Sequence, residues 1–95
     1  MTSEQILHAV GKYELLLGSR EVVPERADLA YWAPEPTEQL SHCLWMCGQI
    51  REILRTPGKE AKAERWLCFI QGVLWASTLG TIDSFRADNT WAPSV

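Results

Sequence analysis

The spacing of apolar residues along the chain predicts four α-helices and an all-α fold. In the first helix, which Thr2 or Ser3 is placed to cap, apolar side chains return every three or four residues until Gly18, a residue type common where helices end. The side chains on this stripe are Ile6, Ala9, Val10, Tyr13 and Leu17. We expect this face to lie against the rest of the chain.

A second and a third helix are predicted at residues 38–55 and 59–79. Thr37 can cap the second helix, and Thr56-Pro57-Gly58 between the two is a stop-and-turn signal. Because so short a connection places consecutive helices side by side in opposite directions, we expect an antiparallel helical hairpin. The apolar stripe of the second helix is Leu40, Cys43, Leu44, Cys47, Ile50 and Leu54.

The third helix is apolar on every side from Trp66 to Ala76, with Gln71 as the exception. Such a helix must be buried all round, and a chain of 95 residues has little else to cover it. One face is expected to join the core through Trp66, Phe69, Ile70 and Val73. A second face is expected to contact another copy of the chain, in a homo-oligomer, through Cys68, Gly72, Trp75 and Leu79. Gly80 is expected to end this helix.

The remaining segments are a long connector, a short last helix and a tail. The connector, residues 19–37, is favoured as a covering segment over a ligand-binding loop, although it carries Arg20, Arg26, Tyr31 and Trp32. Thr81 is placed to cap a helix at residues 82–89. The tail, residues 91–95, has no helical period and is expected to be loose.

Composition and charge narrow the class of protein. The chain is 46% hydrophobic and has a net charge of −3, which fits one globular domain, residues 1–95, and disfavours nucleic acid as a partner. No apolar run reaches the ~20 residues that cross a bilayer, and the N-terminus lacks the features of a signal peptide. The sequence therefore predicts a cytoplasmic protein with no membrane partner.

The sequence predicts neither a metal nor a cofactor, and no catalytic site. Cys43, Cys47 and Cys68 with His42 form a set that can hold zinc, but the spacing is not that of a standard structural zinc site, and the first two fit the core stripe as small reduced thiols. Neither histidine belongs to a nucleophile motif. The carboxylate pair Asp83 and Asp88 is expected on a solvated helix face.

Three motifs in the second half of the chain resemble a family of small, mostly uncharacterised bacteriophage proteins. They are LWMCxxI (residues 44–50), KAxRWLxFIQGxLW (residues 62–75) and GTIDxxRxDN (residues 80–89). The resemblance covers residues 40–89 and implies a phage origin, hence the host cytoplasm, and a helical hairpin. In size and architecture, but not in motif, the chain also resembles phage proteins that sequester cyclic nucleotide or ADP-ribose immune signals.

The sequence favours two functions and leaves a third open, a structural or replication-linked phage accessory. The first is sequestration of a nucleotide-derived immune signal at protomer interfaces without catalysis, because arginine binds phosphate and tryptophan stacks on bases. The second is binding of a host protein through an apolar helical surface. For the first, the candidate ligand-binding residues are Arg51, Arg65, Arg86, Gln71, Asn89 and Trp45.

Each of these residues also has a structural interpretation. Arg65 is placed for a salt bridge with a carboxylate of the second helix such as Glu52, with Trp66 and Trp75 in the core. Gln71, a lone amide among apolar residues, must find hydrogen-bond partners. We expect them either across a symmetric interface or on a ligand.

Overall fold

The computed structural model describes residues 1–27 and 34–93, in which four helices carry all of the regular structure. The helices are α1 (Ser3–Ser19), α2 (Pro36–Ile53), α3 (Glu60–Ala76) and α4 (Ile82–Asn89). The prediction of an all-α fold is confirmed. Tyr31 and Trp32 of the connector lie outside the described residues, so the two interpretations of that segment stay open. No helix within the described ranges has both the length and the apolar character needed to cross a membrane.

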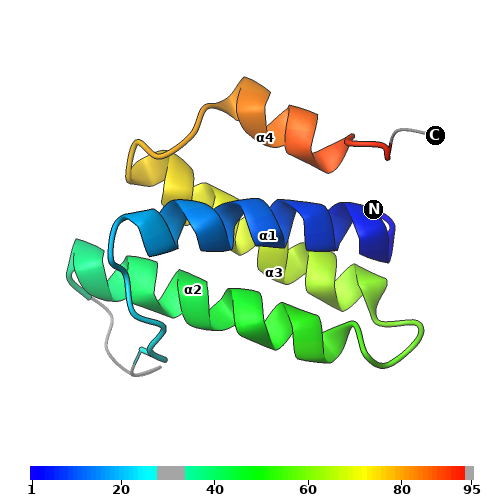
Figure 1. Ribbon diagram of the computed structural model, residues 1–95, viewed down its shortest axis with the longest axis horizontal. Coiled ribbons are helices and arrows are strands. Elements are labelled where there is room, and N and C mark those ends of the chain that lie inside the picture. Colours follow the sequence, from blue (N-terminus) through cyan, green and yellow to red (C-terminus); the bar gives the residue numbers. More distant parts are fainter. Residues whose placement is uncertain (28–33, 94–95) are drawn as a thin grey trace.

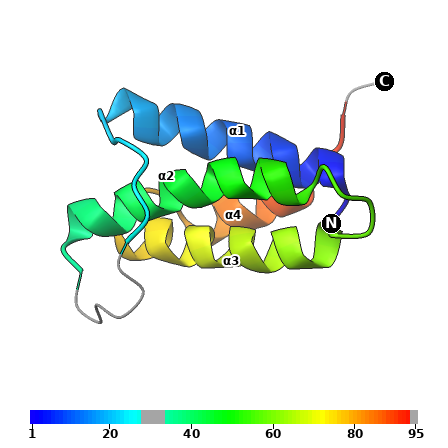
Figure 2. The same ribbon diagram turned by 90° about the horizontal axis from the view of Figure 1, so that it is seen from below.

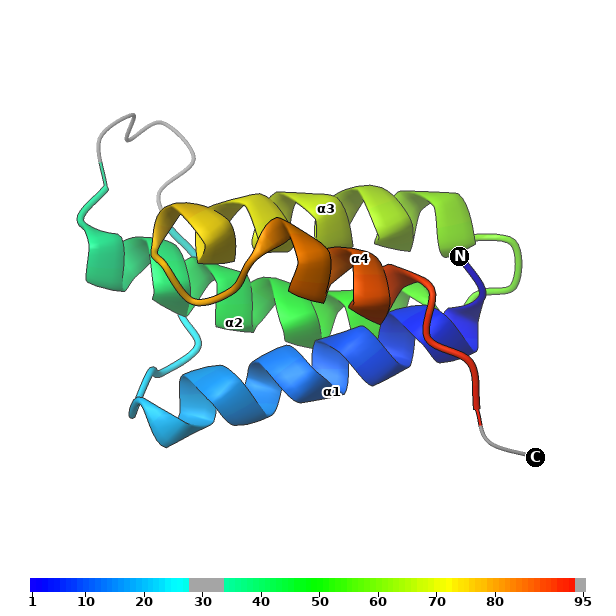
Figure 3. The ribbon, with the colours of Figure 1, turned by 90° about the horizontal axis from the view of Figure 1, so that it is seen from above.

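Each helix runs opposite to the one before it, and α1 packs against all three others (Figure 1). α2 and α3 lie side by side (Figure 2), joined by the turn at residues 54–59. α4 lies over α1 and α3, on the side away from α2 (Figure 3). Residues of α1, α3 and α4 that are far apart in the sequence are therefore brought together on one side of the molecule.

The first helix forms where the sequence predicts it. Thr2 is its N-cap, in a capping box in which the Gln5 N–H donates to Thr2 Oγ1 (3.1 Å) and the Thr2 N–H donates to Gln5 Oε1 (2.9 Å). The predicted stripe is confirmed, since its five members are the buried residues of this helix: Ile6, Ala9, Val10, Tyr13 and Leu17.

The face that α3 turns to the core differs from the predicted one. Ile70 is buried as predicted, but Phe69 is 55% exposed, so its assignment to the core is wrong; Trp66 and Val73 are half-buried. Because α1 packs on α3 in addition to α2, the buried stripe is rotated around the helix. Its members are Ala63, Leu67, Ile70, Gln71 and Leu74.

Two helices end on residues that the sequence does not single out. Gly18 and Gly80 were the predicted end signals, but the left-handed residues are Glu21 (φ 61°) and Thr78 (φ 59°). In α3 the Thr78 N–H donates to the Trp75 carbonyl (3.0 Å) and the Leu79 N–H donates to the Leu74 carbonyl (2.8 Å), the paired bonds of a Schellman ending. α3 therefore stops at Ala76, short of the predicted residue 79.

Both ends of α2 lie two residues before the predicted ones, since the helix is Pro36–Ile53 and the prediction was 38–55. Thr37 was the predicted cap, but Glu35 is the N-cap and Pro36 is the first helical residue. Proline suits this position because its missing N–H would have no partner in the first turn. The helix ends at Ile53, not at residue 55.

The end of the chain is held more firmly than its sequence predicts. Thr81 caps α4 as predicted, in a capping box with Ser84. Beyond α4, the ring of Trp91 stacks on His8 with centroids 3.9 Å apart, and Gln5 Nε2 donates to the Trp91 carbonyl (3.0 Å). The prediction of a loose tail is wrong at Trp91, whereas Ser94 and Val95 lie outside the described residues.

Candidate functional site

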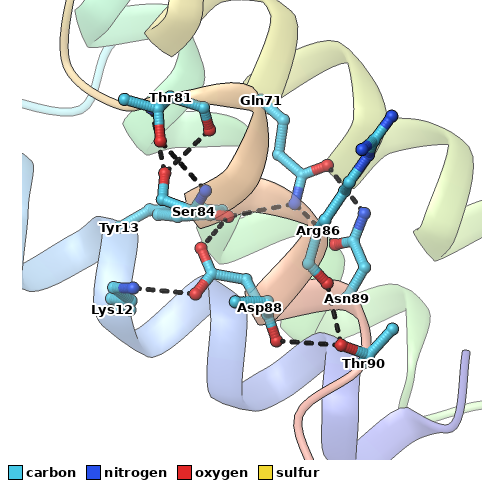
Figure 4. Close-up of polar contacts among 10 residues, drawn as sticks. Lys12, Tyr13, Gln71, Thr81, Ser84, Arg86, Asp88, Asn89 and Thr90 are labelled. Carbon is cyan, nitrogen blue, oxygen red and sulfur yellow. Dashed lines mark hydrogen bonds and ion pairs between the residues drawn. The ribbon is translucent and has the colours of Figure 1, made fainter.

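A buried polar network joins α1, α3 and α4 (Figure 4). Asp88 is at its centre: Oδ1 accepts from Lys12 Nζ (2.7 Å), and Oδ2 accepts from the Tyr13 hydroxyl (2.7 Å). The Asp88 residue is only 5% exposed, so the prediction that it lies on a solvated face is wrong. A carboxylate at this depth requires such donors, because burial of an unpaired charge is costly.

Gln71 continues this network from α3. Its Nε2 donates to the Tyr13 hydroxyl (3.0 Å) and to Asn89 Oδ1 (2.6 Å), while Asn89 Nδ2 donates back to Gln71 Oε1 (3.2 Å). The partners of Gln71 are therefore within its own chain, and the prediction that they lie across an interface or on a ligand is wrong. No buried side-chain nitrogen or oxygen lacks a partner in the described residues.

The surroundings of Tyr13 keep its hydroxyl protonated. Burial is the largest cause, and with the hydrogen bond to Asp88 it raises the Tyr13 pKa well above its usual range. Both carboxylate oxygens of Asp88 are occupied by donors from α1. The network is thus suited to fix α4 against α1 and α3, and it does not present a free acid or base to a substrate.

Beside the network, a shallow cleft of about 320 Å³ lies between α3 and α4. Trp75 and Ile82 on its walls are each 56% exposed. Phe85 is buried below them, and Gly80 admits its ring, since a Cβ at residue 80 would overlap that ring. The full lining is Gln71, Gly72, Trp75, Ile82, Phe85, Arg86 and Asn89, which unites three predicted ligand-binding residues with two predicted interface residues.

The predicted interface residues on α3 are largely exposed. Cys68, Gly72 and Trp75 are open to solvent, and nothing lies within 4 Å of where a Cβ would stand on Gly72. Leu79, by contrast, is half-buried and packs on the chain's own core. We call the exposed surface of Cys68, Gly72, Trp75, Ile82 and Arg86 the α3–α4 face.

Three predicted ligand-binding residues lie outside the cleft. Arg51 makes a two-pronged ion pair with Glu14 across α1 and α2, and the hydrogen bond to Glu14 is the main cause that raises the Arg51 pKa. Arg65 is exposed on α3. The proposed Arg65–Glu52 salt bridge is wrong, because Glu52 pairs with Arg55 (3.3 Å).

Trp45 belongs to a different site, a cluster of aromatic rings on α2 and α3. Its ring centroid lies 5.4 Å from that of His42 and 6.1 Å from that of Trp66, and Phe69 meets His42 edge-on at 6.4 Å. These rings border a pocket of about 250 Å³, which we call the aromatic pocket. Its lining is Arg26, His42, Trp45, Met46, Trp66 and Phe69.

The cysteines divide between core and surface. Cys43 and Cys47 are fully buried in the core, and burial is the main cause that raises the pKa of each thiol to about 12. Cys68, by contrast, is exposed on α3. Within residues 1–27 and 34–93 no group of histidine, cysteine and carboxylate side chains is arranged to hold a metal ion.

The sequence pattern does not predict the hydrogen-bonded roles of Tyr13, Lys12 and Asp88. The available signal was a tyrosine on a buried stripe together with a lone glutamine in an apolar helix, because both bring a polar group into the core. Arg26 and His42 were sequence candidates only for a connector loop and for a zinc set, and nothing in the sequence placed them in one pocket. Neither set is contiguous in sequence, so only the packing of the helices reveals it.

Comparison with known proteins returns no relatives: no protein family, no curated protein and no solved structure matches this chain.

Proposed function

We propose that the protein is a non-catalytic binding module whose α3–α4 face docks an amphipathic helix of a host protein. The observation that supports this most strongly is the cleft, whose walls leave Trp75 and Ile82 each 56% exposed. Large apolar side chains exposed together are typical of interaction surfaces, and a groove between two helices suits a third helix.

The positive charge around the cleft indicates that the partner helix is acidic. Arg86 borders the cleft, and Arg65 lies one turn of α3 before Cys68. The ion pairs of the described residues involve neither arginine. A partner helix with an apolar stripe flanked by carboxylates therefore complements this surface. The phage setting, a counter-defence role and the host cytoplasm as location are supported by the motif resemblance of residues 40–89.

The test is a complex rebuilt from purified components. Host proteins that bind the chain are identified by affinity capture, and one is then titrated into isotope-labelled protein while the indole N–H signals are followed by NMR. We expect the Trp75 signal to shift and the Trp91 signal to stay. Trp75→Glu should abolish binding, whereas Leu15→Glu, at a site on α1 that is 79% exposed, should not. Binding that survives Trp75→Glu, or is lost equally in both variants, refutes the proposal.

A nucleotide-derived immune signal is the second candidate for the same cleft. It is favoured by Arg86, which can bind phosphate, and Trp75, which can stack on a base, on one cleft of about 320 Å³. The polar groups of Gln71 and Asn89 are already bonded to each other, and for this reason we place the protein partner first. Cyclic dinucleotides and cyclic ADP-ribose should shift the Trp75 signal, and Arg86→Gln should weaken binding roughly tenfold. No shift with any member of the panel refutes this candidate.

We also propose that, in the absence of the host protein, the chain forms a homo-oligomer through the same surface, so that a second copy and the host helix compete for it. Cys68 and Gly72 are small and exposed, which allows a helix of a second copy to approach closely. Sedimentation velocity at micromolar concentration should show a dimer or a larger symmetric species that Trp75→Glu returns to the monomer. A wild-type monomer would contradict this part of the proposal and leave the α3–α4 face free for another protein.

A further inference from the structure

The aromatic pocket on the far side of α3 has features that the core does not require. Four rings from two helices contact one another there, yet they border a partly open pocket of about 250 Å³ that they do not fill. Phe69 leaves 55% of its surface exposed, and Met46, which is 6% exposed, forms the apolar floor. A seam that served only to close α2 against α3 would bury these rings against each other.

A positive charge lies at the rim of this pocket. The guanidinium carbon of Arg26 is 5.4 Å from the ring centroid of Trp45, within the range of a cation–π contact. Glu25 and Glu38 border an adjacent hollow with Arg26, but among the described residues no ion pair joins either to it. Among the carboxylates of the described residues none is paired with Arg26, and its guanidinium borders the pocket where an anionic group can reach it.

His42 supplies a directed hydrogen-bond donor. Its Nδ1 accepts from the Ala27 N–H (3.1 Å), which in the neutral ring leaves the proton on Nε2. Burial, and then the charge of Arg26, lower the His42 pKa, so the neutral ring is favoured near neutral pH. No hydrogen bond from Nε2 to another described residue is present.

We propose that the aromatic pocket binds a small planar aromatic molecule that carries one anionic group. The ring lies among Trp45, Trp66 and Phe69, and the anionic group takes the guanidinium of Arg26 and the Nε2–H of His42. A volume of about 250 Å³ is below the ~300 Å³ at which drug-sized ligand sites begin. The occupant is therefore one ring system with one small acidic group. This inference is independent of the proposed function, which concerns the other side of α3.

Four tryptophans of the described residues report on three separate sites, which makes the test specific. Trp45 and Trp66 line the aromatic pocket, Trp75 lines the α3–α4 cleft, and Trp91 stacks on His8. The full chain is isotope-labelled, its indole N–H signals are assigned by Trp→Phe variants, and naphthoate is titrated. We expect a saturable shift of the Trp45 and Trp66 signals alone.

Two matched probes separate the ring from the charge. Naphthylmethanol keeps the rings without the charge, cyclohexanecarboxylate keeps the charge without an aromatic ring, and both should bind at least roughly tenfold more weakly than naphthoate. Adenosine monophosphate tests whether the natural ligand is a nucleotide. If it shifts the Trp45 and Trp66 signals and binds more tightly than naphthoate, the ligand is a nucleotide. If it binds more weakly than naphthoate, the ligand is an aromatic acid.

The variants Arg26→Gln and Arg20→Gln form the matched pair, since both arginines are exposed in the connector. Arg26→Gln should weaken naphthoate binding roughly tenfold, and Arg20→Gln should leave it unchanged. The proposal is overturned if naphthylmethanol binds as tightly as naphthoate, or if Arg26→Gln leaves the affinity for naphthoate unchanged. It is also overturned if neither naphthoate nor adenosine monophosphate gives a saturable shift. A shift of Trp75 alone would also overturn it, while supporting a small anionic ligand in the α3–α4 cleft.

Discussion

Removing the Tyr13 hydroxyl should destabilise the fold by about 2–3.5 kcal/mol. In Tyr13→Phe the ring, which is 2% exposed and meets Phe85 edge-on, stays in place. The change removes two hydrogen bonds, one to the Asp88 carboxylate (2.7 Å) and one from Gln71 (3.0 Å). A bond to a charged group contributes about 1.5–3 kcal/mol and a neutral one about 0.5–1.5 kcal/mol. For the bond from Gln71 we take the lower end of this range, because Gln71 Nε2 still donates to Asn89 Oδ1 in the variant.

Urea unfolding followed by circular dichroism measures this change. A loss of ~3 kcal/mol in a domain of this size also lowers Tm by roughly 12–24 °C. Lys12→Met is the comparison: it removes the amine from the same carboxylate but leaves the Tyr13 hydroxyl bonded to it. Because the Lys12 side chain is 55% exposed, water can take the place of the amine, and the loss should be smaller than that of Tyr13→Phe.

A double-mutant cycle of Tyr13→Phe with Asp88→Ala isolates the pair, and the coupling energy should reach at least ~1 kcal/mol. If Tyr13→Phe costs less than ~0.5 kcal/mol, the hydroxyl does not hold the buried carboxylate, and the structural role assigned to the network is refuted.

Three further changes test other parts of the fold. The Cys43 and Cys47 thiols have pKa values raised from 9.0 to about 12, so the unfolded chain loses these protons first. Stability should be intact below about pH 8, where both thiols are protonated in either state, and fall by about 2–3 kcal/mol from pH 8 to pH 10 in urea unfolding; a Cys43→Ala/Cys47→Ala variant should show a much smaller fall. Thr78→Gly should add about 1 kcal/mol because φ is 59° there, and a lower urea midpoint would contradict the left-handed ending of α3. Gly80→Ala should cost about 1–3 kcal/mol through overlap with the Phe85 ring, whereas Gly72→Ala should gain about 0.5–1 kcal/mol in the monomer; thermal unfolding of the pair checks both, and equal effects would refute the assigned packing.

The local features of the fold could be predicted because each depends on residues close together in the sequence. The capping boxes of Thr2 and Thr81 and the buried stripe of α1 are such features. The predicted ending at Gly18 was wrong because the end of a helix also depends on hydrogen bonds to its last carbonyls and on packing. Here the Glu21 N–H donates to the Gly18 carbonyl and the Val22 N–H donates to the Leu17 carbonyl. In this chain Val22 packs against the core after Glu21 takes the left-handed conformation, which outweighs the preference of glycine for that position.

The candidate site could be predicted only in part. Gln71, Arg86, Asn89, Gly72 and Trp75 do line one cleft, because α3 and the start of α4 are joined by a short segment. Other predicted ligand-binding residues lie outside this cleft, because their side chains contact residues of other elements. Arg51 pairs with Glu14 of α1, and Trp45 lies among rings beside Arg26.

The sequence by itself determined that this is an all-helical chain and which residues of α1 face inward. It also showed that Gln71 is a lone amide in the apolar α3, which must find hydrogen-bond partners. Only the tertiary structure decided which face of α3 is core and what the amide binds. The reason is that α3 has apolar side chains on all sides, so its periodicity cannot select a face. The packing of α1 and α4 selects it, by bringing Tyr13 and Asn89 within hydrogen-bonding distance of Gln71 and leaving Trp75 exposed.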